Sequence, residues 1–272
     1  MGTEVAKNDL MWVKAGEQYA SREKAEGGHF LSLAGGVFKL GDEPVPGNQL
    51  CVVILDAIFE NAFYAEKWTQ DGPVKPPTCY AMAHEQDALA PMIEHMKADM
   101  EHFEPQHDQC AGCPQNEWGS ADTGKGKACG NRRRLALIQA GEYVPTRGVR
   151  GAFELEAFEE EEHYKAADLT FLKLPVTSGK EFSKFVKATL RDFGRPPYGV
   201  VTRVYIEHGG SSQFTVKFEA LEVLPDEWFE TINSRHLEAK EAIMRPYEPP
   251  SNDDEAPARS ANTRLQGLKK KR

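Results

Sequence analysis

Apolar and polar positions along this chain change in short runs, which is typical of β-strands joined by tight turns. Residues 30–33 and 37–40 are two such runs, and the Gly35-Gly36 pair between them predicts a β-hairpin. Residues 50–59 are almost continuously apolar and predict a central strand. Cys51 lies within this run, and we interpret it as a small buried hydrophobic residue.

Four later runs also have strand character. Residues 135–138 and 169–174 are short apolar runs, and a proline follows the second. Residues 198–207 and 213–223 flank a Gly-Gly-Ser-Ser segment and predict a second hairpin. The chain is therefore rich in short strands that hairpins connect.

Two helices interrupt this pattern. Residues 178–193 carry apolar side chains at helical spacing, and Gly194 follows where such a helix would end. Residues 225–244 predict a second helix with proline in its first turn. Few helices among many short strands predict a mainly β chain with flanking helices (α+β), arranged as a small β-barrel.

Composition shifts predict how the 272 residues are organised. The two ends are polar, and the last part is rich in Pro, Asn, Asp, Ala and Ser. A proline-rich stretch leads out of the sheet after residue 70, and strand character returns near residue 135. We therefore expect a flexible lead-in (1–27), a β-barrel domain (28–224) with an insertion at about 71–134, a C-terminal helix (225–245) and a disordered tail (246–272).

The insertion contains the spacing of a zinc site. Cys110 and Cys113 form a Cys-x-x-Cys pair, and Cys129 follows in a Gly- and Asn-rich loop that has little apolar core. A metal would supply the missing folding energy, so we predict structural zinc rather than free thiols. Cys79, which follows two prolines, is the first candidate for the fourth ligand, and His107 is the second.

Positive charge gathers in and after the same loop. No acidic residue occurs from 124 to 134, and lysines that alternate with glycines can approach phosphate closely. Lys127 is followed by alanine, so the Walker pattern of nucleotide hydrolysis is not met. Aromatic rings are candidates for base stacking, and the alternative is packing, in the core for Tyr64 and Trp68 and over the zinc loop for Trp118. The residues concerned are Lys125, Lys127, Arg132, Arg133 and Arg134, with Tyr64, Trp68 and Trp118.

The overall charge does not oppose this interpretation. The formal net charge of -9 argues against coating a polyanion with the whole surface, but a local groove can carry the opposite field. Much acidic charge lies in residues 154–162, which we interpret as a solvated loop or face. No apolar run is long enough to span a bilayer and the N-terminus lacks the apolar core of a signal peptide, so we expect a cytoplasmic protein.

These motifs resemble those of single-stranded-DNA-binding-like proteins of tailed bacteriophages. The resemblance covers most of residues 28–224 and implies an OB-like barrel with an inserted zinc loop, in which Cys79 completes a four-cysteine set. The shared elements are a similar sheet opening at 30–68, Pro-Pro-x-Cys at 76–79, Cys-x-x-Cys-Pro-x-Asn-x-Trp-Gly-Ser at 110–120, Gly-Lys-Gly-Lys-Ala-Cys at 124–129, Arg-Arg-Leu at 133–135 and Val-Val-Thr-Arg at 200–203.

The resemblance and the basic loop together predict a non-catalytic protein that coats single-stranded DNA in phage replication or recombination, with low sequence selectivity. Arg203 joins the basic residues as a phosphate contact, and the host cytoplasm is the expected location. The tail is the expected contact for phage or host replication and recombination proteins. It departs from a typical single-strand binder, because its acidic patch at 253–255 is followed by a basic end.

Two other function classes are compatible with the residues. A zinc-containing adaptor that binds a replication or transcription protein would use the acidic surface. A metal-dependent nuclease would need a cluster of carboxylates. Asp56 and Glu60 are four apart on one predicted strand and face the same side, but no convincing partner set accompanies them.

Overall fold

A computed structural model describes residues 30–40, 43–66, 76–96, 102–209 and 214–246. The predicted lead-in, Trp68 and almost all of the predicted tail lie outside these ranges. The described strands are β1 (Phe30–Ala34), β2 (Val37–Leu40), β3 (Glu43–Pro44), β4 (Gln49–Phe63), β5 (Cys79–Ala83), β6 (Gly130–Pro145), β7 (Phe153–Ala157), β8 (Thr170–Leu174), β9 (Val200–His208) and β10 (Phe214–Val223). The helices are α2 (Ile93–Met96), α3 (Glu161–Ala166), α4 (Gly179–Phe193) and α5 (Phe229–Ala242).

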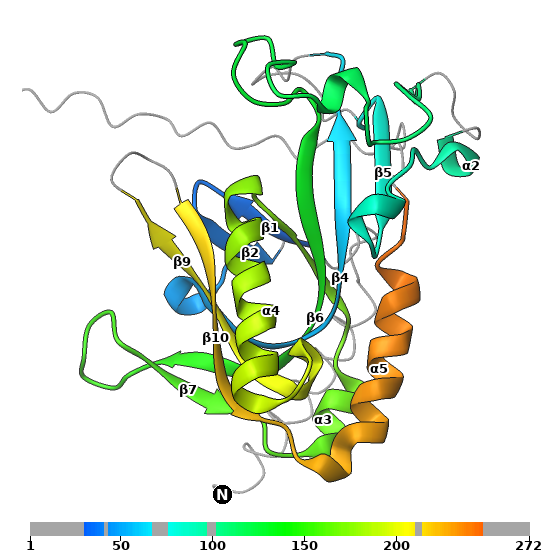
Figure 1. The fold of residues 1–272 in the computed structure, drawn as a ribbon. Coiled ribbons are helices and arrows are strands. Elements are labelled where there is room, and N and C mark those ends of the chain that lie inside the picture. Colours follow the sequence, from blue (N-terminus) through cyan, green and yellow to red (C-terminus); the bar gives the residue numbers. More distant parts are fainter. Residues whose placement is uncertain (1–29, 41–42, 67–75, 97–101, 210–213, 247–272) are drawn as a thin grey trace, which may run out of the picture.

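The described strands form one mixed sheet around two long strands, β4 and β6 (Figure 1). Its order is β10-β9-β4-β6-β8-β1-β2-β3, with β5 added to β4 and β7 to β6. β1 pairs with β8 in parallel, and the other pairs are antiparallel. The predicted α+β class, both hairpins and the central strand are therefore confirmed.

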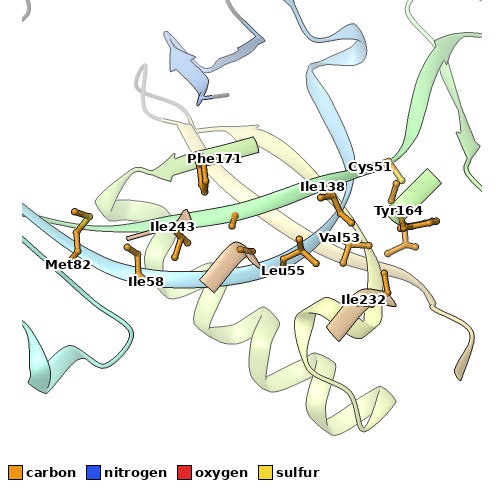
Figure 2. Close-up of a cluster of buried hydrophobic side chains, with 14 of the residues drawn as sticks. Cys51, Val53, Leu55, Ile58, Met82, Ile138, Tyr164, Phe171, Ile232 and Ile243 are labelled. Carbon is orange, nitrogen blue, oxygen red and sulfur yellow. The ribbon is translucent and has the colours of Figure 1, made fainter. Parts of the chain in front are cut away.

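The apolar run of β4 is explained by a hydrophobic core on each face of the sheet. Val53 and Leu55 belong to one core, whereas Val52 and Ile54 belong to the other. Side chains alternate between the faces of a strand, so a strand that is covered on both sides needs apolar residues at every position. Cys51 is 2 % exposed within the first core, which confirms that it is a buried hydrophobic residue (Figure 2).

The two predicted helices cover these cores from opposite sides. Phe182 and Phe185 of α4 contact Phe218 of β10, with ring centroids 5.3 and 5.6 Å apart. Ile232 of α5 and Ile243 just after it enter the core on the other face (Figure 2). The residue after α4, Gly194, has a φ of 66°, the left-handed conformation that favours glycine at a helix end.

The predicted closure into a barrel is not seen in the described strands, because their order is an open path from β10 to β3. The two ends of that path nevertheless approach each other. A Cβ at Gly36, in the β1–β2 turn, would lie 2.8 Å from a ring carbon of His208 at the end of β9. The β1–β2 turn thus lies against the facing ends of β9 and β10, so the sheet is curled.

Candidate functional site

The cysteine-containing segment leaves and re-enters the sheet at one end of β4. Cys79 opens β5 opposite Phe63, and Gly130, directly after Cys129, opens β6 opposite Ala62. Because these partners are neighbours on β4, strand pairing alone brings both ends of the excursion together. The long strands in turn connect this end of the molecule to its opposite end (Figure 1).

Four thiols line one small cavity at this end. Its walls include Cys79, Cys110, Cys113 and Cys129, and its volume of about 20 Å³ suits a single water-sized guest. His107, the second candidate for a fourth ligand, lines the same cavity. Within the described ranges, however, no group of three or more Cys, His, Asp or Glu side chains is arranged to hold a metal ion. The four thiols therefore line one cavity, but they are not arranged as the ligands of a formed metal centre.

The electrostatics of the thiols also show that they lie close together. The pKa of Cys129 is raised to about 12, first by burial and then by Cys110, Cys79 and Cys113. Burial is also the main cause that raises the pKa of Cys79 and of Cys110, and Cys113 adds to both shifts. Neighbouring thiols that disfavour one another's ionisation are a donor set that a divalent cation would stabilise as thiolates.

A set of asparagines attaches the cysteine loop to the strand ends. The Asn116 side chain donates to the Cys110 carbonyl at 2.8 Å and accepts from Asn131 at 3.0 Å and from Lys127 at 3.1 Å. Asn131 also donates to Asn61 of β4 at 2.7 Å. These bonds fix Lys127 relative to β4 and β6, so the loop presents its charge from a defined position.

A groove runs between this loop, the ends of β4 and β6, and the first half of α4. Its volume is about 710 Å³. We call it the basic groove, because six of its lining residues are basic and none of the described lining residues is acidic. The basic residues are Lys127, Arg132, Arg133, Lys180, Lys184 and Lys187.

Half of this charge comes from α4, which sequence reasoning missed. Lys180, Lys184 and Lys187 are spaced by four and three residues and so share one helix face. Lys184 is paired with Glu181 at 2.7 Å, but no acidic partner is seen for Lys180 or Lys187 among the described residues. Gly179, the first residue of α4, also lines the groove, so the positive end of the helix dipole faces it. The lysine spacing was the signal in the sequence that could have revealed this face.

The three consecutive arginines have three different environments. Arg132 is exposed, and Arg133 is half-buried with its guanidinium 3.3 Å from the ring centre of Phe59. Arg134 is only 2 % exposed, and its Nε donates to Glu60 at 2.6 Å. The prediction that Arg134 contacts nucleic acid is therefore wrong, because its side chain is buried inside the molecule and bonded there to Glu60.

The aromatic candidates lie at the same end of the molecule but outside the groove lining. Trp118 is 81 % exposed, and the Lys127 ammonium lies 5.9 Å from its ring centre. Tyr64, at the end of β4, is 43 % exposed and close enough to Arg132 to feel its charge. Burial is the main cause that raises the Tyr64 pKa. Phe59, which sequence reasoning did not single out as a site residue, does line the groove.

Two predicted basic contacts stand apart from the groove. Lys125 is exposed on the cysteine loop, outside the groove lining. Arg203 is paired in register with Cys51, nine positions along β4 from the partner of Arg132, which is about 30 Å of strand. Its guanidinium bonds Gln49 and Glu219. The structure does not bring Arg203 to the basic groove.

Acidic charge lies at the other end of β6. β7 carries the exposed Glu154 and Glu156 and pairs with the last residues of β6, from Gly141 to Pro145. The acidic stretch 154–162 is thus a largely solvated surface, as predicted, formed by a strand and the start of a helix. The molecule separates its charges along one long strand.

The two carboxylates considered for a nuclease have other partners. Glu60 is fully buried, and both Arg134 and Lys173 contact its carboxylate, at 2.5 and 3.4 Å. Asp56 contacts His84 Nε2 at 2.8 Å. Glu60 is therefore part of an interior ion-pair cluster.

The comparisons with known proteins assign no family to the chain. No family model matches it, and neither a curated protein nor a solved structure is significantly similar to it. In the described ranges, no helix has both the length and the apolar character to cross a membrane. The geometry of the site is therefore the basis for assigning a function.

Proposed function

We propose that this chain is a non-catalytic protein that binds single-stranded DNA through the basic groove, with low sequence selectivity. The observation that carries the proposal is a groove with six basic lining residues, drawn from two separate segments, in a chain whose net charge is -9. A negatively charged protein has no general reason to concentrate cations in one concavity. Such a groove is what tracking a phosphate backbone requires.

The surroundings of the groove favour a single strand over a duplex. Exposed rings stand near the groove: Trp118 lies next to the groove cation Lys127, and Tyr64 is close to Arg132. Unpaired bases can stack on such rings, whereas the bases of a duplex are already stacked on each other. Stacking tolerates every base, which is the reason for low selectivity.

We also propose that a structural zinc ion binds the four-cysteine cavity. Four thiols are the donor set of structural zinc sites, and all four line this one cavity. When bound, the ion would supply folding energy and hold the thiols as thiolates. The asparagine bonds from this loop then keep Lys127 at the groove.

The fold and the resemblance point in the same direction. The curled sheet, whose ends meet through Gly36 and His208, would be a partly open relative of an OB-like barrel. With the phage-like cysteine motif, this supports a role in phage replication or recombination in the host cytoplasm. Partner proteins of the replication machinery would bind the tail.

A salt titration tests the proposal. Fluorescence anisotropy of a labelled single-stranded oligonucleotide should show tight binding at low salt and weaker binding to duplex. If all six groove cations contact phosphates, log K should fall with log salt at a slope of about -4. Absence of binding at low salt would refute the proposal.

A matched pair of variants on α4 locates the interface. Lys187→Gln removes a groove cation and should reduce affinity and flatten the salt slope by about 0.7. Arg191→Gln removes a cation from the same helix outside the groove, where Asp192 already pairs with it, and should leave both quantities unchanged. Equal losses from the two variants would show that the basic groove is not the binding site.

The acidic end of β6 supports a second candidate, a zinc-containing adaptor. Leu155 stands between Glu154 and Glu156 on the exposed β7 strand, a mixed acidic and apolar surface that suits a basic protein partner. Glu154→Lys with Glu156→Lys should abolish binding of such a partner but leave oligonucleotide binding intact.

A further inference from the structure

A second pocket continues the basic groove and differs from it chemically. It has a volume of about 370 Å³ and shares Arg133, Ser183 and Lys187 with the basic groove. Beyond these shared residues its walls are mostly apolar and aromatic, and they come from β4, α4, α5 and the segment after α4. This volume is in the range of about 300–1,000 Å³ that is typical of pockets for small organic groups.

Two stacked rings form one wall of this pocket. Tyr198 and His236 lie with their ring centres 4.6 Å apart and their planes 19° from parallel. His236 Nδ1 is 2.7 Å from the Leu55 carbonyl, which fixes the orientation of its ring on β4. The two rings are thus held in a fixed arrangement, and a planar group that enters the pocket meets a rigid aromatic wall.

The charge of the pocket distinguishes it from a phosphate site. Asp56 is the one acidic residue among its described lining residues, and its carboxylate would repel phosphate. One Asp56 oxygen, Oδ2, is 2.8 Å from His84 Nε2, a contact that orients the carboxylate. A carboxylate accepts hydrogen bonds and does not donate them, so it suits the amino group of a base.

We infer that this pocket is a nucleobase subsite of the bound strand and that Asp56 selects a base with an exocyclic amino group. The inference rests on the proposed binding of single-stranded DNA and extends it. The cations at the junction, Arg133 and Lys187, hold the phosphate of one nucleotide. Its base then leaves the basic groove, enters between the apolar walls, and donates its amino group to Asp56. At this one position, the otherwise unselective site would prefer a base that carries an amino group.

Homopolymers of cytosine and thymine test the inference, because they differ in this amino group. Anisotropy with labelled oligo(dC) and oligo(dT) of equal length, at one salt concentration, should show oligo(dC) bound about tenfold more tightly, equivalent to 1.4 kcal/mol. Asp56→Asn, nearly isosteric, should abolish the difference in affinity between the two oligonucleotides. His84→Gln keeps the carboxylate and should keep the preference, which controls for loss of the Asp56–His84 pair.

The outcomes separate the subsite from the groove. Equal binding of both oligonucleotides by the wild type, or a preference that survives Asp56→Asn in a folded variant, would overturn the subsite and leave the basic groove standing. Failure of the wild type to bind either oligonucleotide at low salt would instead refute the proposed function, and the subsite with it. A urea midpoint for Asp56→Asn close to that of the wild type shows that the variant is folded.

Discussion

Arg134 allows a test of whether the buried and the exposed residues of the run Arg132 to Arg134 have different roles. Its Nε and NH2 groups contact Glu60 at 2.6 and 2.5 Å, and its NH1 group donates to the carbonyls of Ile243 and Arg245 at 3.0 and 2.8 Å. One side chain therefore ties β6 to β4 and also satisfies carbonyls beyond the end of α5. Arg134→Met keeps the length and apolar stem of the side chain and removes all of these contacts.

The cost of this change follows from what remains behind. The Glu60 carboxylate is fully buried, so it has no access to water when Arg134 is removed; Lys173 also contacts it, at 3.4 Å. Removing one partner of a buried ion pair typically costs about 3–5 kcal/mol, since it leaves an uncompensated charge in the interior. Arg134→Met should therefore reduce the free energy of unfolding by about that amount.

Urea denaturation followed by circular dichroism measures this effect. The matched control is Arg132→Met, nearer the start of β6, where the side chain is exposed; it should change stability by no more than about 0.5 kcal/mol but weaken oligonucleotide binding. The double variant Glu60→Leu/Arg134→Met removes both charges and should be more stable than Arg134→Met alone. The reasoning is refuted if Arg134→Met keeps wild-type stability, or loses DNA binding without any loss of stability.

Two further predictions concern the thiols and a buried tyrosine. Cys79→Ser should lower both the zinc content, measured by atomic absorption, and the melting temperature. Cys51→Ser, outside the cavity, should leave the zinc content unchanged. A wild-type protein without zinc would contradict the proposed metal site. The pKa of Tyr164 is raised from 10.0 to about 12, mainly by burial, so the unfolded chain loses this proton first. The contribution of the neutral Tyr164 hydroxyl to the free energy of unfolding should therefore be fully present below pH 10 and be lost as the pH rises from 10 to 12. Tyr164→Phe should make that fall shallower, and an identical pH profile for the variant would contradict the assignment.

Local patterns in the sequence were sufficient for most elements of the fold. The run at 50–59 identified the central strand, because a strand covered on both faces leaves a continuous apolar signal. The start of β6 was missed, because Asn131, Arg132 and Arg133 are polar and only pairing with the end of β4 makes them a strand. Closure of the barrel depends on contacts between the first and last strands, which no local pattern encodes.

The candidate site was predictable in its cysteines and only partly in its charge. The spacing of Cys110, Cys113 and Cys129 placed them in one cluster, because a short loop keeps such residues close. A run of adjacent arginines, in contrast, does not reveal which face each side chain takes. Contacts with Glu60 and with the residues after α5 bury Arg134, and strand register places Arg203 about 30 Å along β4 from the partner of Arg132, so neither reaches the groove.

The placement of α4 explains how a chain with a net charge of -9 can still offer a site for a polyanion. Its apolar face packs on β10 through Phe182 and Phe185, and this turns the lysine face toward the cysteine loop. The acidic β7 strand meets the far end of β6, about 30 Å along the strand from Arg132. At physiological ionic strength the Debye length is about 8 Å, so the acidic end is screened from a ligand in the groove. The segregation of charge along β6, and not the sum of charges, therefore determines which ligand the groove can accept.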